Sequence, residues 1–340
     1  MSHSKLFLRL YLHETDACAE NVNWLNPELH VQDKRAGDAL KVHLKGWQMG
    51  VADLHIHTEW SDGMMSVRAL IQHVSSSCVL DVVAITDHDQ IGGALEAFRQ
   101  AAEPGYEGPS IVVGIETTTK WLRHVIGLFF RPPFPVEPLP RFEALEKTVS
   151  RIAEFGGIAV VPHPMSVLVP SLHQSDIERF LATAMGPNLV GVEVASGVLG
   201  GRRKENAIRA KNVGKWGLAE IGASDAHHLT QVGSALTWFP GVTAADLEAA
   251  LLARKTKAVW GTVAKVPVAA HVRQVWRAWT ETPFRGGRPK PPGMEPRSYS
   301  LPGTIGSVTR ASSIPRSCTA EANEMNSSST ISVMVGDFAC

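Results

Sequence analysis

The regular alternation of short apolar runs with helical patterns constrains the fold of this chain most. The runs are rich in Val, Ile and Leu and near-continuously apolar, which is typical of parallel strands buried on both faces of a sheet. They predict strands at residues 51–57, 81–86, 110–117, 124–130, 158–163, 189–195 and 218–223. Helical patterns are predicted at residues 66–75, 93–102, 142–155, 175–184, 204–216 and 244–253. This alternation indicates an α/β fold, either a closed barrel or an open wound sheet.

The segments on either side of this block differ from it in composition. Residues 1–48 show weak periodicity and are predicted to be an N-terminal extension of unclear structure, whereas residues 49–262 hold the α/β domain. Valine and tryptophan recur at helical spacing within residues 263–282, which predicts an amphipathic helix docked on that domain. Residues 283–340 are rich in Pro, Gly and Ser, and we expect a disordered tail because they bury too little surface to offset the ordering entropy.

Composition excludes several classes of protein. Lys and Arg number 33 and Asp and Glu number 33, so the chain as a whole offers no positive field for a nucleic acid. The first apolar run, Leu6-Phe7-Leu8, is too short for a signal peptide or a membrane span. Scattered cysteines fit neither a disulfide framework nor a zinc knuckle, and they are Cys18, Cys78, Cys318 and Cys340. We therefore expect a cytoplasmic protein without a membrane partner.

Two histidines share a face at the end of the first predicted strand. Alternate side chains of a strand point the same way, so His55 and His57 project together and can hold one metal ion. The turn Ser61-Asp62-Gly63 follows shortly after and can return the carboxylate of Asp62 to the same point. Taken alone, this pattern fits two ordinary histidines on a strand equally well.

Further histidines and carboxylates follow at the ends of later strands. Most of these groups lie where a strand gives way to a helix, which is the edge at which α/β folds place their sites. Without metal, three carboxylates on one rim would repel one another and carry a large desolvation cost. Nine candidate ligands are too many for one ion, so two or three ions of Mn, Fe or Zn are expected. The groups are TDHD (86–89), GIE (114–116), HVIG (124–127), VPHP (161–164) and SDAH (224–227).

In order along the chain, the motifs DLHIHTEWSDG, AITDHD, GIE, HVIGLF, VVPHP, GVEVASG and GASDAHH resemble the PHP (polymerase and histidinol phosphatase) family, in its branch of small stand-alone phosphoesterases. The resemblance covers about residues 50–262. It implies a distorted (β/α)7 barrel, similar to a TIM barrel, whose two- or three-metal site hydrolyses phosphate esters. Carried over position by position, the metal ligands would be His55, His57, Asp62, His88, Glu116, His124, His163, Asp225 and His227.

One departure from the family pattern limits what can be transferred. Family members that act on nucleoside bisphosphates or RNA ends carry an inserted subdomain between the strand with His124 and the motif with His163. Here 38 residues, 125–162, lie in that interval, which is enough for a loop and one helix. The expected substrate is therefore a phosphomonoester of a small metabolite or nucleotide.

Hydrolysis at such a site requires an activated water and donors for the phosphoryl oxygens. Coordination to the ions would lower the pKa of a bound water, so that a metal-activated hydroxide attacks the phosphorus. Arg202 and Arg203 are candidates for contacts with the substrate phosphate, because they follow a strand within a Gly-rich turn. The alternative for both arginines is that, with Lys204, they form a solvated helix start.

Three further residues near the motifs are given secondary roles. Asp87 and Asp89 flank a candidate ligand, and we expect them to orient ligand imidazoles through hydrogen bonds. His228 is a candidate proton donor to the leaving group, and the alternative is an exposed residue without a role.

Other functions share parts of this pattern. An exonuclease or oligonucleotide phosphodiesterase would use the same metal site, but it needs a strand-binding track, and no basic stripe with interleaved aromatics is present in the core. A metal-stabilised interaction module is disfavoured by complete ligand pairs on several strands. Hydrolysis of a C–N bond is disfavoured because no lysine is suitably placed to form a metal-bridging carbamate. A small phosphorylated substrate is therefore the expected partner, and short nucleic acids are less favoured.

Overall fold

The computed structural model describes residues 11–13, 43–45, 49–77 and 79–261, and, beyond them, residues 266, 270, 272–274 and 276. Strands β1 (Tyr11–His13) and β2 (His43–Lys45) pair with each other in parallel. Most of the predicted N-terminal extension and docked helix, and the whole predicted tail, lie outside the described residues. None of the described helices is long and apolar enough to cross a lipid bilayer.

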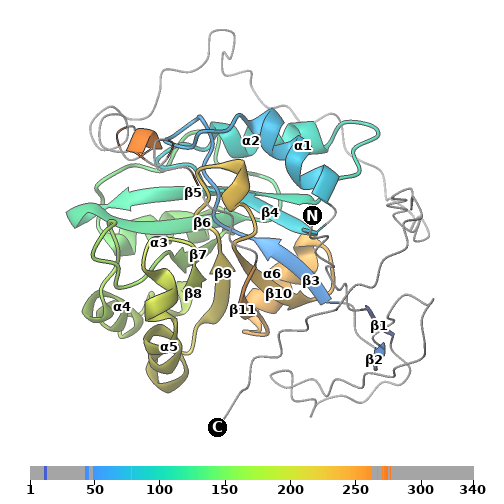
Figure 1. Cartoon of the computed structure of the whole chain (residues 1–340). Coiled ribbons are helices and arrows are strands. Elements are labelled where there is room, and N and C mark those ends of the chain that lie inside the picture. The colour runs from blue at the N-terminus through green and yellow to red at the C-terminus, as the bar shows by residue number, and fades with distance from the viewer. Residues whose placement is uncertain are drawn as a thin grey trace. The chain divides into compact units, whose positions relative to one another are not determined.

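A nine-stranded sheet curls into a nearly closed barrel (Figure 1). Its strand order is β11-β10-β3-β4-β5-β6-β7-β8-β9. The end strand β9 is joined to β10, the second strand from the other end, through Thr237, whose hydroxyl accepts from Gly222 N at 3.0 Å and donates to Gly222 O at 2.8 Å. The strands are β3 (Met49–Asp53), β4 (Val82–Ile85), β5 (Ser110–Thr119), β6 (Arg123–Phe129), β7 (Ile158–Val161), β8 (Leu189–Ser196), β9 (Ala219–Ala223), β10 (Ala235–Pro240) and β11 (Lys257–Trp260).

Each helix follows a strand along the chain, and helices α1 to α5 lie around the outside of the sheet in Figure 1. They are α1 (Val67–Ser77), α2 (Gly92–Ala101), α3 (Leu145–Glu154), α4 (Gln174–Leu181), α5 (Gly201–Lys211) and α6 (Ala244–Leu252). Short helical turns are η1 (Lys120–Leu122), η2 (Gly186–Asn188), η3 (Asn212–Trp216) and η4 (Leu229–Gln231). Helix α6 begins with a reciprocal cap, because the Thr243 hydroxyl accepts from Asp246 N at 3.1 Å while the Asp246 carboxylate accepts from Thr243 N at 3.0 Å.

Two apolar layers stabilise the barrel, one on each face of the sheet. On β6, Ile126 and Leu128 belong to the inner layer, together with residues of β3, β4, β7 and β9 and with helix α6. The neighbouring Val125 and Phe129 belong to the outer layer, where they pack with buried residues of α1 to α5. Alternate residues of one strand thus enter different layers, as the pleat of a strand requires. Burial on both faces explains why the strands read as continuous apolar runs.

Three details of the sheet differ from the sequence-based expectation. Strand β6 is antiparallel to both β5 and β7, because the three residues of η1 between β5 and β6 are too few for a crossover to a parallel strand. As a result, the start of β6 lies at the same rim as the carboxyl ends of its neighbours β5 and β7. The first predicted strand also ends earlier, at Asp53, and β10 and β11 were not predicted. The prediction of an α/β barrel is confirmed.

Candidate metal centre

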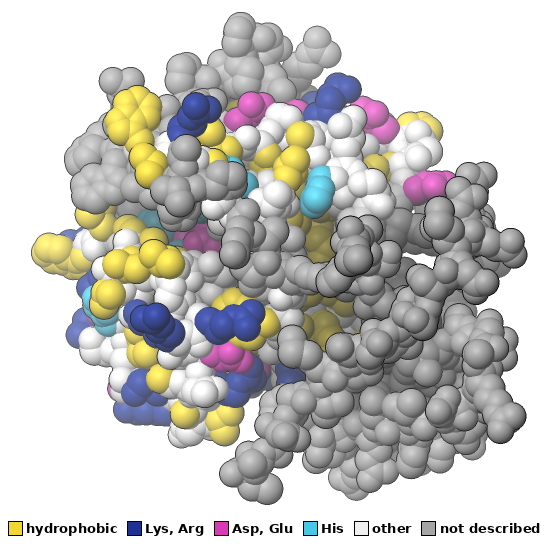
Figure 2. Space-filling view, in the orientation of Figure 1, with side chains coloured by type: hydrophobic (Ala, Val, Ile, Leu, Met, Phe, Trp, Pro, Cys, Tyr) yellow, Lys and Arg dark blue, Asp and Glu magenta, His cyan; other side chains and the backbone are white. Residues whose placement is uncertain are grey.

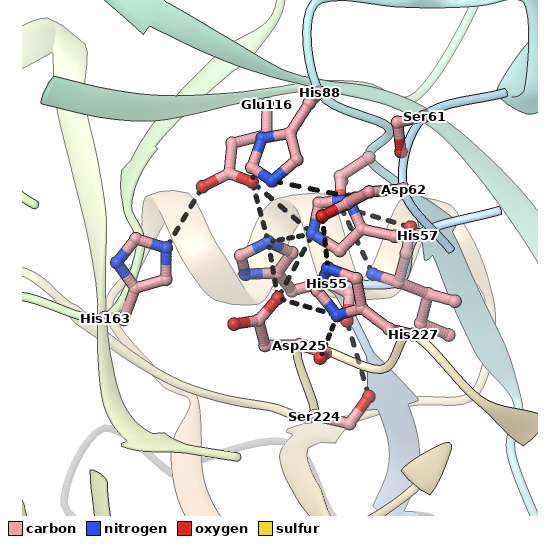
Figure 3. Close-up of polar contacts among 12 residues, drawn as sticks. His55, His57, Ser61, Asp62, His88, Glu116, His163, Ser224, Asp225 and His227 are labelled. Carbon is pink, nitrogen blue, oxygen red and sulfur yellow. Dashed lines mark hydrogen bonds and ion pairs between the residues drawn. The ribbon is translucent and has the colours of Figure 1, made fainter. Parts of the chain in front are cut away.

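Glu116 lies at the centre of a buried cluster on the rim of the barrel (Figure 3). It projects from β5, and its side chain is fully buried. Its two carboxylate oxygens lie 2.9 to 3.4 Å from ring nitrogens of five histidines. These rings come from the segments after β3, β4 and β7 and from the start of β6, and they are His55, His57, His88, His124 and His163.

Two further carboxylates close the cluster on the side of β3 and β9. The Asp62 Oδ2 atom lies 3.2 Å from His227 Nε2. The Asp225 Oδ1 atom lies 3.1 Å from His57 Nε2 and 3.4 Å from His55 Nε2. All nine predicted ligand positions are therefore brought together, although they are spread over more than 170 residues of sequence between His55 and His227.

Three sets of ligand atoms in this cluster overlap. Each set gathers atoms within 4.8 Å of one another. His57 belongs to the first and second sets, Glu116 to the second and third, and His88 to the first and third. Adjacent cation positions that share a carboxylate would have this arrangement, whereas one isolated ion would not. The sets are His57–Asp62–His88–His227, His55–His57–Glu116 and His88–Glu116–His124.

Backbone interactions hold the loops of the cluster in place. Ile56 and Ala226 form a parallel β-bridge, which sets the His55–His57 segment beside the Asp225–His227 segment. Both oxygens of the buried Asp53 accept from backbone N–H groups, that of Ser224 at 3.0 Å and that of Gly233 at 2.8 Å. A Cβ atom at Gly63 would lie 2.3 Å from the His57 carbonyl oxygen, so glycine is required for the turn that returns Asp62 to the rim.

Glu193 is a site residue that the sequence analysis missed. It lies on β8 and is fully buried. One carboxylate oxygen is 2.7 Å from His55 Nδ1, and the other accepts from the backbone N–H of His163 at 2.7 Å. Glu193 therefore fixes the ring of His55 with Nε2 directed at the cluster. The one sign of this role in the sequence is that Glu193 is a single carboxylate within the mostly apolar run GVEVAS.

Asp87 and Asp89 organise loops rather than imidazoles. Among the described residues, Asp87 accepts from Thr58 N at 2.6 Å, from the Thr58 hydroxyl at 2.7 Å and from the Ser61 hydroxyl at 2.7 Å. Asp89 accepts from Thr118 N at 2.7 Å and from the Thr118 hydroxyl at 2.8 Å. Neither contact pattern includes a hydrogen bond to a ligand ring, so the expected orienting role is replaced by support of the Asp62 loop and of β5.

The two arginines that were predicted to contact the substrate phosphate lie on helix α5. Arg202 and Arg203 are both exposed in the first turn of α5, and the Arg202 guanidinium stacks 4.3 Å above the Trp260 ring. Lys204 instead lines a small hollow that also includes His163. His228 is half-buried and lines a separate hollow with Met64 and Met65, next to the loop that carries His227.

Mutual electrostatics shift the pKa values of the clustered groups. The pKa of His57 is lowered to about 3, mainly because burial disfavours the charged ring and also because the His227 and His88 rings are close. Burial likewise opposes protonation of His88, but attraction by Glu116 and Asp62 outweighs it and raises the pKa of His88 to about 10. Burial alone would raise the pKa of Glu116, yet the His88 ring and its neighbours hold it well below the usual range. Glu116 is thus ionised and could serve as a ligand for a cation.

Unpaired buried atoms indicate that the cluster fits metal ions. Five of them lack hydrogen-bond partners: Asp62 Oδ1 and the Nδ1 atoms of His57, His88, His124 and His163. The Nδ1 atoms of His88 and His124 lie 3.0 and 2.9 Å from Glu116 oxygens without the geometry of a hydrogen bond. Unpaired polar atoms are costly to bury, and convergent lone pairs are what a cation binds. Imidazole and carboxylate together suit Mn, Fe or Zn.

Comparison with known proteins finds similarity over most of the stretches that carry the clustered residues. The family profile of the PHP domain matches residues 53–178, and that of the PHP-associated segment matches residues 203–256. An uncharacterised protein of Methanocaldococcus jannaschii is 35% identical over 132 residues, which are 36% of this chain and 71% of that protein.

Two characterised relatives match over shorter stretches. A 3′,5′-nucleoside bisphosphate phosphatase of Chromobacterium violaceum is 32% identical over 26% of this chain, and a 5′-3′ exoribonuclease of Haemophilus influenzae is 37% identical over 24%. This chain spans only 30% of the length of each of these two.

A solved structure has the same fold. It is a two-domain Bacteroides vulgatus protein that contains a predicted PHP-like metal-dependent phosphoesterase, and it matches with a TM-score of 0.51 at 18% identity, over 74% of this chain and 73% of that one. The family profiles, the matched relative and the barrel agree with the ordered motifs: the chain belongs to the PHP family of metal-dependent phosphoesterases.

Proposed function

We propose that this protein hydrolyses phosphomonoesters of small metabolites or nucleotides at a centre of two or three divalent ions. The observation that carries the proposal is the overlap of the three ligand sets through Glu116, His57 and His88. A structural metal site saturates one ion with about four ligands. Nine clustered donors are better explained by several adjacent ions that share a carboxylate, as in enzymes that transfer phosphoryl groups.

The protein groups have distinct parts in this proposal. His55, His57, Asp62, His88, Glu116, His124, His163, Asp225 and His227 would hold the ions. Bound divalent ions of Mn, Fe or Zn would supply the charge that makes a coordinated water acidic and that stabilises the phosphoryl oxygens. Glu193 would keep His55 in one ring orientation, and the Asp87 hydrogen bonds would keep the Asp62 loop in place. The apolar layers on both faces of the sheet would keep this constellation rigid.

The segment between β6 and β7 favours a small substrate. Only one helix, α3, lies between these strands, and it packs with the outer layer through Val149 and Ile152. This interval therefore provides no separate subdomain to cover the rim. Nucleotides are the first substrates to test, because two relatives are named as a nucleoside bisphosphate phosphatase and an exoribonuclease. The matched stretch covers only 30% of the length of each relative.

The second candidate function is an oligonucleotide phosphodiesterase, and one comparison of rates separates the two. We expect the manganese-loaded protein to hydrolyse adenosine 5′-monophosphate with a kcat/KM at least about a hundredfold above that for the dinucleotide ApA, a difference of about 2.7 kcal/mol in transition-state binding. The physical reason is that a monoester has three unsubstituted oxygens for the ions, whereas an internal diester has two and needs a track for the second nucleoside. A preference for ApA would reject the monoesterase and support the phosphodiesterase.

A further inference from the structure

Two large aromatic side chains stand exposed on the rim that carries the cluster. The Trp121 side chain in η1 is 78% exposed, and Phe142, in the loop before α3, is 48% exposed. Their segments are joined by backbone hydrogen bonds, from Lys120 N to Glu143 O and from Phe142 N to Thr118 O, both 2.7 Å long. Figure 2 shows hydrophobic side chains beside Lys and Arg along the left edge of the view, toward which β5 and β6 extend in Figure 1.

The backbone at these residues is strained. Trp121, Leu122 and Phe142 have φ angles of 64°, 55° and 59°, in the left-handed region that bulky side chains rarely adopt. Trp121 gains little from burial that could offset this cost, because most of its surface remains in water. Strain of this kind persists where the surrounding structure enforces it, and it concentrates at functional sites. The turn η1 at the tip of the β5–β6 hairpin therefore holds an indole ring in solvent at an energetic cost to the folded chain.

The tip is tied directly to the cluster. In the β5–β6 ladder, Thr118 pairs with His124 and Thr119 pairs with Arg123, so η1 is the continuation of the strand pair beyond the proposed ligand His124. Trp121 is three residues from His124, so the Cα atoms of the two residues lie at most about 10 Å apart, the length of three extended residues. This reach is comparable to the length of one nucleotide, measured from its phosphate to the far side of its base.

Cations flank both rings. The Lys120 ammonium lies 5.3 Å from the Trp121 ring centroid, and the Arg141 guanidinium lies 4.7 Å from the Phe142 ring centroid. Arg141 is in turn held by Asp89, with Nε 2.9 Å from the carboxylate. Each cation lies over one face of its ring, so a ligand that fits this surface carries a flat aromatic ring for the opposite face and negative charge for the cations.

We propose that Trp121 is the stacking platform for the nucleobase of a nucleotide whose phosphate is held at the metal cluster. This inference rests on the proposed phosphomonoesterase function and extends it to a substrate class. Lys120 and Arg141 add positive charge beside the ribose–phosphate part of the ligand. A free nucleotide and the 5′-phosphorylated end of an oligonucleotide present the same base and phosphate, so the chemistry recognised at Trp121 is common to both sources.

The test compares a substrate that has a base with one that has none. We expect Trp121→Ala in the full, manganese-loaded chain to lower kcat/KM for adenosine 5′-monophosphate at least about tenfold, mainly through KM, which corresponds to about 1.4 kcal/mol. The value for glycerol 2-phosphate should change less than about threefold, because this substrate has no ring to stack. Trp121→Phe should retain most of the activity on the nucleotide. Trp238→Ala, which removes another partly exposed indole from β10, is the matched control and should leave both values unchanged.

A binding measurement without turnover completes the test. The phosphonate analogue of adenosine 5′-monophosphate should quench the fluorescence of the wild-type protein and bind the Trp121→Ala variant at least about tenfold more weakly. A parallel assay with 5′-phosphorylated ApA measures the ratio of kcat/KM between the wild-type protein and Trp121→Ala. Comparing this ratio with that for adenosine 5′-monophosphate distinguishes the oligonucleotide end from the free nucleotide. If the wild-type protein hydrolyses both monoesters and Trp121→Ala slows both equally or neither, Trp121 is not a stacking platform for the base. The proposed phosphomonoesterase function is retained in that case. If the wild-type protein hydrolyses neither, the proposed function fails and this inference fails with it.

Discussion

Replacing Glu116 with glutamine is expected to lower phosphomonoesterase activity at least about a thousandfold, at the upper end of what the loss of one electrostatic group costs an active site. The substitution keeps the size of the side chain but removes the negative charge that five histidine rings surround at 2.9 to 3.4 Å. It also introduces an amide N–H₂ group, which is a donor and cannot bind a cation. The loss should therefore appear in kcat and in the metal content together.

The control for this variant is Glu178→Gln, which removes a carboxylate on helix α4, outside the cluster. It should retain full activity and the same metal content. Far-UV circular dichroism of Glu116→Gln should match that of the wild-type protein, because the apolar layers of the barrel do not depend on this charge. A Glu116→Gln protein with wild-type turnover would contradict the central place of Glu116 in the site.

Removal of metal by a chelator is expected to abolish activity and to lower the thermal midpoint. An ion present at a hundred times its dissociation constant stabilises the folded state by about 2.7 kcal/mol. For a domain of this size each kcal/mol corresponds to about 2–4 °C, so the loss of one such ion should lower the midpoint by about 5–11 °C. Differential scanning calorimetry before and after chelation measures this shift, and added Mn²⁺ or Zn²⁺ should restore both midpoint and turnover.

The same treatment of the Glu116→Gln variant serves as a control for unspecific effects of the chelator. Its midpoint should shift by less than that of the wild-type protein, because the variant binds fewer ions at the start. Equal shifts in the two proteins would mean that the stabilising ions lie elsewhere. An unchanged wild-type midpoint together with retained activity would show that the cluster does not require metal.

The strands of the barrel could be predicted where burial on both faces of the sheet alone determines the residue pattern. Continuous apolar runs identified the strands β3 to β9, because each is buried on both faces. The direction of β6 was missed, since apolar periodicity is the same for parallel and antiparallel strands and only the three-residue link of η1 reveals it. The partly exposed Trp238 interrupts β10, and β11 begins with a lysine and is fully buried only at Ala258, so neither stood out as an apolar run.

The candidate site could be predicted where residue type alone carries the chemistry. Histidine and carboxylate at strand ends are unusual enough that the ordered motifs identified all nine clustered positions. Glu193 was missed because a single glutamate on a strand does not reveal which loops lie above it in the fold. Arg202 was singled out for its charge, but the register of α5 directs its guanidinium to Trp260, and sequence does not specify that register. The role of Trp121 required its exposure and backbone conformation, which only the structure gives.

Anomalous diffraction from crystals grown with Mn²⁺ can show how many ions the cluster holds, because it locates each ion and its ligands independently of any substrate. We expect two or three manganese peaks within the cluster, with all nine residues from His55 to His227 in contact with at least one ion and the Glu116 carboxylate bridging two of them. A single ion bound by about four of these side chains, or no manganese peak in the cluster, would contradict this expectation.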